Sequence, residues 1–253
     1  MLKKIVVVQC ATGKQLALDE NLLIFKQRPS FVVLPEYFNV NPARRDTERN
    51  TVEGHEWLRY CRTLSERFET ILIAGTAVES DGERFFNTSI VFNNGERIGS
   101  YRKQNPTVNE RNHNITPGTE PTIIEVGGVR ISILICADVL KPENFERLRS
   151  LDPDIVFIPT VSPFIPNETI KEKYARDEKL FVEGSRVSGA YCVKCCGVGE
   201  LWGGRLQGRS LVSAPWGIMQ RVSPENEDKT RIFSVVLDIS EIREFREKQR
   251  LVR

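Results

Sequence analysis

The sequence predicts an α/β protein in which mixed β-sheet carries helices on its outer faces, as a layered sandwich. Two observations support this prediction. Runs typical of strands alternate with amphipathic, helix-like segments over most of the 253 residues. No linker-like, repetitive or low-complexity stretch divides the chain, so we expect a single domain over residues 1–253.

The pattern predicts each element by its period and its turn residues. Strands are expected over residues 4–10, 31–34, 70–78, 84–92, 96–103, 122–126, 129–136, 154–159, 190–196, 205–213, 218–222 and 232–237. Helices are expected over residues 14–26, 53–68, 142–149 and 168–186, with a short one from Ser240. Asn93-Asn94-Gly95 and Gly127-Gly128 are turn sequences, and they predict two hairpins.

The composition limits which classes of protein the chain can belong to. The chain is 40% hydrophobic and 28% charged with a net charge of +2, which is typical of a globular protein and argues against a nucleic-acid partner. No apolar stretch approaches the roughly 20 residues of a membrane span, and the N-terminus lacks the features of a signal peptide. We therefore expect a cytoplasmic protein with no membrane partner, whose six cysteines are free thiols.

Three reactive side chains end strand-like runs. Cys136 follows the apolar run 129–135, Glu36 closes residues 31–36, and Lys103 closes residues 97–103. An α/β protein exposes side chains at the carboxyl edge of its sheet, where they can meet a substrate. The sequence therefore predicts a catalytic constellation of a thiol, a carboxylate and an ammonium group.

These three groups suit acyl transfer through a thioester. A free thiol is mostly protonated near neutral pH, so Cys136 needs a base, and Glu36 can take its proton. Lys103 and the backbone N–H of Ala137 can stabilise the developing oxyanion. Neither of the two histidines ends a strand, which disfavours a Cys-His arrangement.

The flanking motifs resemble the carbon–nitrogen hydrolase (nitrilase) superfamily over nearly the whole chain. They are Leu34-Pro-Glu-Tyr-Phe38, Asn87-Thr-Ser-Ile-Val-Phe92, Gly99-Ser-Tyr-Arg-Lys103, Ile135-Cys-Ala-Asp138 and Leu211-Val-Ser-Ala-Pro-Trp-Gly217. Each motif alone is weak, and their shared order is specific. The chain is similar to the amidase-like branches more than to true nitrilases, because Ala-Asp follows the nucleophile where true nitrilases tend to have Trp-Glu.

The resemblance implies a four-layer αββα sandwich and a Glu36-Lys103-Cys136 triad. It also implies hydrolysis of a nonpeptide C–N bond in a small-molecule amide or carbamoyl compound, without metal or cofactor. Relatives often carry a second glutamate in the loop after the lysine, and Glu110 is the candidate, with Glu120 as the alternative. A homodimer or larger even oligomer is expected from the same resemblance.

Ala137 departs from the family pattern. Many relatives place Tyr, Trp or Glu directly after the nucleophile. The backbone N–H survives the change to alanine, but a bulky wall of the pocket is lost. Asp138, which follows, is typical of amidases and favours amides over nitriles.

Each assignment has a structural alternative. Cys136 could be a small buried apolar residue, Glu36 a carboxylate at a helix start, and Lys103 or Glu110 solvated surface charges. The whole chain could then be a catalytically silent binding or scaffold protein. A soluble acyltransferase with the same triad is the remaining alternative.

Cys192, Cys195 and Cys196 form a cluster that invites a zinc interpretation. No second pair of Cys or His follows at ligand spacing, and the segment is predicted to be a strand. Cys192 and Cys196 would then face one side of the sheet and Cys195 the other. We expect buried sheet thiols and no metal.

Overall fold

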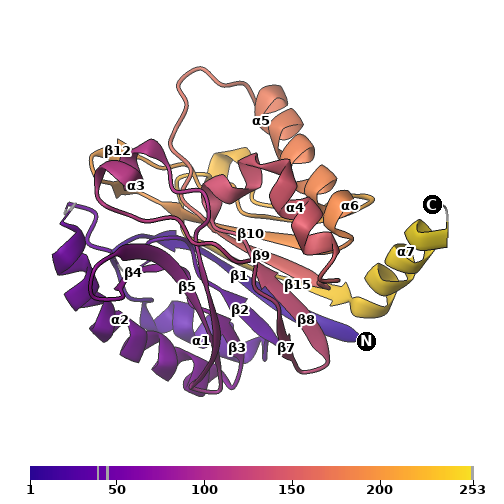
Figure 1. Cartoon of the computed structure of the whole chain (residues 1–253), viewed down its shortest axis with the longest axis horizontal. Coiled ribbons are helices and arrows are strands. Elements are labelled where there is room, and N and C mark those ends of the chain that lie inside the picture. Colours follow the sequence, from indigo (N-terminus) through magenta and orange to yellow (C-terminus); the bar gives the residue numbers. More distant parts are fainter. Residues whose placement is uncertain (39, 44–45, 252–253) are drawn as a thin grey trace.

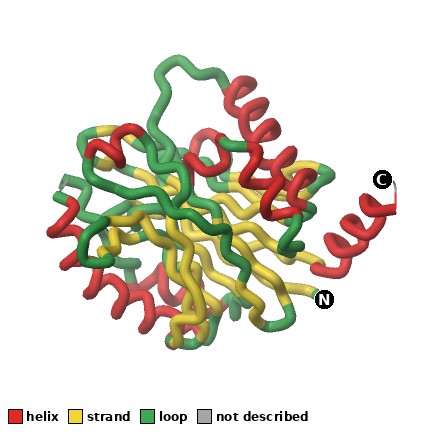
Figure 2. Tube along the Cα trace, viewed as in Figure 1, coloured by secondary structure: helices red, strands yellow, loops and turns green. Residues whose placement is uncertain are grey.

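The computed structural model describes residues 1–38, 40–43 and 46–251 of the chain. Two β-layers face each other and helices cover their outer sides, so the predicted αββα sandwich is confirmed (Figures 1 and 2). The layers join where β1 (Leu2–Ala11) pairs in parallel with β10 (Tyr191–Val198) at their carboxyl ends.

In the first layer β1 lies between two strands, and the other strands extend the sheet beyond β2. These strands are β15 (Arg231–Asp238), β2 (Phe31–Val33), β3 (Ile71–Ile73), β5 (Phe85–Asn93), β4 (Ala77–Ser80) and β6 (Glu96–Arg102). The second layer runs through β7 (Ile124–Val126), β8 (Val129–Ile133), β9 (Ile155–Thr160), β10, β13 (Leu211–Ala214) and β14 (Gly217–Arg221). A separate small hairpin pairs β11 (Glu200–Leu201) with β12 (Gly204–Arg205).

Helices flank both layers. On the outer side of the first layer lie α1 (Leu18–Lys26) and α2 (Thr47–Phe68), and on that of the second lie α4 (Pro142–Arg149), α5 (Ile170–Asp177) and α6 (Glu183–Ser188). The other helical segments are α3 (Val108–Asn112), α7 (Ile239–Leu251), the 3-10 turns Cys136–Leu140 and Pro224–Asn226, and the π-turn Glu178–Val182. In Figure 1, α7 extends away from the sandwich at the C-terminus.

Strand alternation explains the two cores. In β1, Ile5 and Val7 point into the core between the layers, whereas Val6 joins the core beneath α2. The rings of Phe31 and Phe157 lie 5.5 Å apart and link the two layers. Because these strands are buried on both faces, they are near-continuous apolar runs in the sequence.

The predicted strand over residues 70–78 is wrong in one respect, because it is two strands, β3 and β4. Gly75 lies in the break with a φ of 58°. A Cβ there would lie 2.1 Å from the carbonyl oxygen of Pro35, so only glycine allows this approach. Thr76 Oγ1 accepts a hydrogen bond from Tyr37 N at 3.0 Å. The break therefore holds the segment that carries Glu36.

Further boundaries differ from the prediction. The helices expected over residues 14–26 and 53–68 begin at Leu18 and Thr47. The strand expected over residues 129–136 ends at Ile133, and a 3-10 turn begins at Cys136. The helix expected over residues 168–186 begins at Ile170, where Thr169 caps it, and the π-turn Glu178–Val182 interrupts it. The strand expected over residues 205–213 divides into β12 and β13 because hydrogen bonds to loop partners occupy the segment between them.

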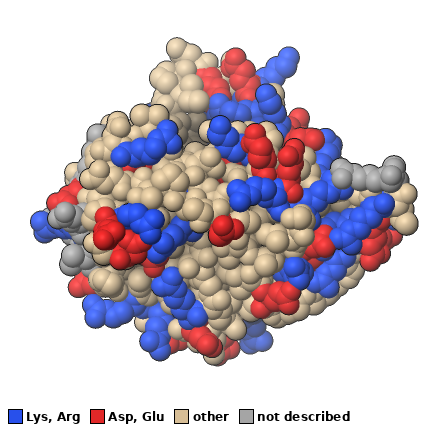
Figure 3. Space-filling model, viewed as in Figure 1, with Lys and Arg blue, Asp and Glu red and all other residues tan. Residues whose placement is uncertain are grey.

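Charges on the visible face are mixed, with Lys and Arg interspersed among Asp and Glu (Figure 3). Across the described part of the chain, no helix has both the length and the apolar character needed to cross a membrane.

Candidate active site

The predicted constellation comes together between the two layers. Glu36 follows β2, Lys103 follows β6, and Cys136 begins the turn after β8. The side chains of Glu36 and Lys103 are buried, and Lys103 Nζ donates a hydrogen bond to Glu36 Oε1 at 2.8 Å. All three residues line one cavity.

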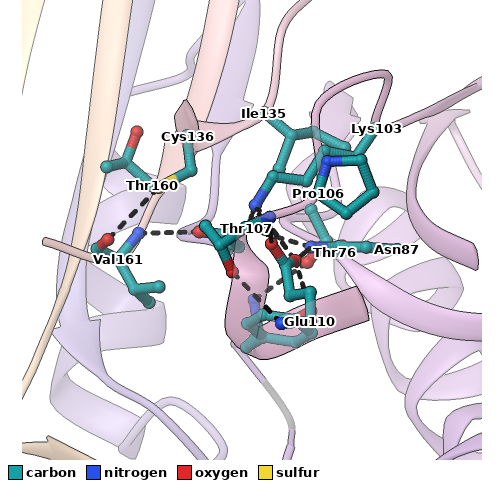
Figure 4. Close-up of polar contacts among 12 residues, drawn as sticks. Thr76, Asn87, Lys103, Pro106, Thr107, Glu110, Ile135, Cys136, Thr160 and Val161 are labelled. Carbon is teal, nitrogen blue, oxygen red and sulfur yellow. Dashed lines mark hydrogen bonds and ion pairs between the residues drawn. The ribbon is translucent and has the colours of Figure 1, made fainter. Parts of the chain in front are cut away.

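Glu110 is the second glutamate of the site, and Glu120 is an exposed residue. Lys103 Nζ donates to both oxygens of Glu110, at 3.0 and 2.8 Å (Figure 4). Glu110 does not lie in an irregular loop as expected, because Thr107 caps the short helix α3 around it. The same capping box directs the Glu110 carboxylate back towards Thr107 and Lys103.

Further donors fix the Glu110 carboxylate. Its Oε1 accepts from Tyr37 Oη at 2.7 Å and from Asn87 Nδ2 at 2.8 Å, and its Oε2 accepts from Thr107 N at 2.7 Å. Asn87 Nδ2 also donates to Glu36 Oε1 at 2.9 Å. The two glutamates are therefore held by a shared set of donors with Lys103 between them.

Cys136 has a strained backbone. Its φ is 45°, in the left-handed region that non-glycine residues rarely adopt and that costs about 1–3 kcal/mol. The Sγ donates to Val161 O at 3.3 Å (Figure 4). Val161 N donates to Glu36 Oε2 at 3.0 Å. One residue at the end of β9 thus positions both the thiol and the carboxylate.

Burial and neighbouring charges shift the pKa values of the reactive groups, and the raised pKa of Cys136 favours the neutral thiol at rest. Burial, together with the charge of Glu36, raises the pKa of Cys136 well above its ordinary value despite Lys103. Burial also raises the pKa of Glu36, with Lys103 opposing the shift and Glu110 adding to it. Burial opposes ionisation of Glu110 as well, but Lys103 and the hydrogen bonds outweigh it, so the pKa of Glu110 is lowered.

Lys103 stays charged. Burial alone would lower its pKa, but the charges of Glu36, Cys136 and Glu110 outweigh burial and raise it. The Lys103 ammonium is therefore a fixed positive charge beside the thiol, which is what a developing oxyanion requires.

Ala137 lines the cavity and follows Cys136 in the 3-10 turn. The first N–H groups of such a turn have no acceptor within the turn, so the Ala137 N–H is not used by the hydrogen bonds of the turn itself. Asp138 instead is buried outside the cavity lining, where it accepts from Tyr101 Oη at 2.8 Å, Ile135 N at 2.9 Å and Asn105 N at 2.7 Å. Asp138 thus holds the 3-10 turn that begins at Cys136, and it has no contact that would select an amide.

The cavity measures about 550 Å³. Near the reactive groups its walls include Tyr37, Val139, Leu140 and Trp202. The π-turn that interrupts the predicted long helix contributes Leu180 and Phe181 to the wall. Such turns often occur at functional sites.

Several residues of the site were not predicted from the sequence. Asn87 and Tyr37 lie inside two of the family-like motifs, so the motifs themselves contained the signal. Thr107 and Glu110 match the capping-box pattern, which was available as a helix-start signal. Val161 acts through its backbone, for which the sequence carries no signal.

The three clustered cysteines are buried thiols in β10. Cys195 Sγ donates to Val8 O at 3.2 Å and to Val33 O at 3.3 Å, towards the other layer. Among the residues that the structure describes, no group of three His, Cys, Asp or Glu is placed to hold a metal ion.

Comparisons with known proteins show the family of the chain. The family model described as Carbon-nitrogen hydrolase matches residues 11–247. A glutamine-dependent NAD(+) synthetase from Aquifex aeolicus is 31% identical over 62% of this chain, which spans about a quarter (27%) of that relative. A nitrilase from Pyrococcus abyssi is 24% identical over 84% of this chain and 79% of its own.

A solved structure shares the fold. The carbon–nitrogen hydrolase from Helicobacter pylori G27 superposes with a TM-score of 0.83 at 18% identity, covering 100% of this chain and 95% of its own. The shared fold is consistent with the family match. The chain belongs to the carbon–nitrogen hydrolase family.

Proposed function

We propose that this carbon–nitrogen hydrolase is a cysteine-dependent amidohydrolase that cleaves the C–N bond of a small amide or carbamoyl compound. The observation that carries the proposal is the meeting of Glu36, Lys103 and Cys136 in one open cavity. A buried thiol without a base or a cavity would instead favour a silent binding or scaffold protein.

In the first half-reaction, ionised Glu36 takes the Sγ proton as the sulfur attacks the carbonyl carbon. The Lys103 ammonium and the Ala137 N–H stabilise the oxyanion of the tetrahedral intermediate. The C–N bond breaks when protonated Glu36 gives its proton to the leaving nitrogen. A thioester on Cys136 and a free amine or ammonia result.

In the second half-reaction, Glu36 takes a proton from water, and the resulting nucleophile attacks the thioester carbon. The C–S bond breaks, the carboxylic acid leaves, and protonated Glu36 returns its proton to the sulfur, which restores the thiol. The raised pKa of Glu36 suits a group that accepts and returns a proton in each half-reaction. Glu110 touches no reacting atom in this scheme and acts as a positioning residue for Lys103.

The preference for amides over nitriles rests on the Ala137-Asp138 sequence pattern and on the name of a relative. The Asp138 side chain itself is turned away from the cavity and makes no contact there. The name of the Aquifex relative specifies glutamine, which carries an amide, whereas the Pyrococcus relative is named for nitriles. We propose amide chemistry because of the former.

A substrate panel tests the proposal. Purified protein is incubated with primary amides, carbamoyl amines and nitriles, and ammonia release is measured. We expect release from at least one amide, and loss of that release in Cys136→Ala. Equal behaviour of the two proteins across the panel would contradict the proposal.

Soluble acyl transfer uses the same residues and differs only in the acceptor. Adding an amine to the reaction distinguishes it, because transfer would give a new amide instead of the acid. The homodimer or larger even oligomer and the cytoplasmic location stay predictions. Light scattering after size-exclusion chromatography measures the former directly.

A further inference from the structure

A chain of alternating charges runs behind one wall of the active cavity. Arg176 Nη2 lies 3.0 Å from Glu168 Oε2, and Arg209 Nη1 lies 3.9 Å from the same oxygen. Asp177 Oδ1 follows, 3.3 Å from Arg209 Nη2 and 3.5 Å from Lys194 Nζ. Three cations thus share two carboxylates.

The surplus positive charge is buried. The side chains of Lys194 and Arg209 are only 3% and 6% exposed. Among the described residues, Arg209 Nε and Nη1 donate no hydrogen bond. Buried charges are normally paired and buried donors normally satisfied, because either omission destabilises the fold. An anion beside these residues would supply the missing charge.

The three cations line the cavity, whereas the carboxylates of Glu168 and Asp177 do not. Arg176, Lys194 and Arg209 all line the cavity that contains Cys136. Of the described lining residues, the acidic ones are Glu36 and Glu110, at the reactive end. Three cations that are not part of the reactive set therefore line the same cavity, and we call Arg176, Lys194 and Arg209 the basic wall.

Lys194 is unexpected in its strand. It lies inside β10, whose other members are apolar, small or thiol side chains, and its Nζ lies 4.8 Å from the centre of the Phe181 ring. A lysine in the interior of a strand is costly unless its charge has a partner. Because Lys194 lines the cavity, its charge is placed where it could bind an anionic group of a substrate.

We propose that the basic wall binds a carboxylate of the substrate, so that the substrate class is an amide with a carboxylate remote from the scissile carbon. This inference rests on the proposed amidohydrolase function and deepens it. The amide end would lie at Cys136 and the anionic end at Lys194 and Arg209.

The kinetic test compares matched substrates. Monoamides of succinate, glutarate and adipate are compared with methyl-terminated primary amides of equal length, and kcat/KM is measured from ammonia release. We expect the anionic member of the best pair to be preferred roughly 10- to 100-fold, the effect of one charge-assisted hydrogen bond. Equal or lower kcat/KM for every anionic member would overturn the inference.

Variants assign the preference to the basic wall. In Lys194→Met the ratio of the two kcat/KM values should fall towards one, whereas Lys194→Arg keeps the charge and should restore most of it. Lys171→Met removes a charge from the exposed side of α5 and should retain the wild-type ratio. A ratio that survives Lys194→Met in a folded protein would contradict the assignment.

A binding test separates this inference from the proposed function. In Cys136→Ala, which cannot form a thioester, glutarate should raise Tm in a concentration-dependent manner, and pentanol at equal concentration should not. Glutarate binding without any amide turnover in wild type would support the basic wall and contradict the amidohydrolase. Turnover of neutral amides without a glutarate effect or an anionic preference would do the opposite.

Discussion

Glu110→Gln should lower both stability and activity, although it replaces only one carboxylate oxygen with an NH2 group. Oε2 of Glu110 accepts from Lys103 Nζ and Thr107 N, and Oε1 accepts from Lys103, Tyr37 and Asn87. An amide nitrogen at either position would face at least two donors. Flipping the side chain cannot relieve this conflict.

The expected cost can be worked from the contacts. Removing one partner of a buried ion pair costs about 3–5 kcal/mol, and the lower end applies here because Lys103 keeps Glu36. For a protein of this size, about 3 kcal/mol lowers Tm by roughly 6–12 °C. Displacement of Lys103 from the oxyanion position should lower kcat/KM by roughly 100-fold.

Glu120→Gln is the matched control, because Glu120 belongs to the same connection and is exposed. Its unfolding free energy should stay within about 0.5 kcal/mol of wild type. Thermal unfolding and ammonia release are measured for both variants. If Glu110→Gln matched Glu120→Gln in Tm and in kcat/KM, the argument from the Glu110 contacts would be wrong.

Three further predictions follow from single contacts. Because ionised Glu36 is the base and its pKa is raised above 4.5, kcat/KM should fall as the pH drops through a midpoint above 4.5; a midpoint at or below that value would contradict this. Gly75→Ala should lower kcat/KM more than Gly82→Ala, since a Cβ at Gly75 meets Pro35 O at 2.1 Å whereas Gly82 has open space; equal effects would refute the steric argument. Asp154→Asn should cost about 3 kcal/mol at neutral pH, because Arg243 Nη2 and Arg246 Nη2 each lie 2.7 Å from the Asp154 carboxylate. Burial opposes ionisation of Asp154, but these partners and Arg130 N hold the pKa of Asp154 below 3.8. The stabilisation by Asp154 is therefore present above that pH and is lost as the pH falls further. A difference in unfolding free energy between wild type and Asp154→Asn that does not change with pH, measured by urea denaturation, would contradict this.

The layers and the reactive residues could be predicted from the sequence for a physical reason. Strands buried on both faces are continuous apolar runs in the sequence. A reactive side chain at the end of such a run lies at the carboxyl edge of the sheet, where binding sites form. Glu36 and Cys136 follow this rule, because β2 and β8 are buried, whereas Lys103 follows the partly exposed strand β6 and was found from the motif around it. The motif around Glu36 also contained Tyr37, although its contact with Glu110 was not foreseen.

Other features depend on contacts that a single chain segment does not encode. The break at Gly75 requires glycine because the carbonyl of Pro35, in the segment after β2, approaches it closely. Asp138 matched an amidase pattern, yet Tyr101 and Asn105 from another part of the chain turn it into a structural residue. The basic wall joins Arg176 and Lys194 across the fold, so its charge balance is not apparent from either segment alone.

The central claim is that Cys136 carries the acyl group during turnover. The most direct measurement is intact mass spectrometry of rapidly quenched reactions with an amide that the protein hydrolyses, followed by peptide mapping. We predict an added mass equal to the amide minus ammonia, located on the peptide containing Cys136 and absent from Cys136→Ala. An acyl group on another residue, or undiminished ammonia release by Cys136→Ala, would contradict the account.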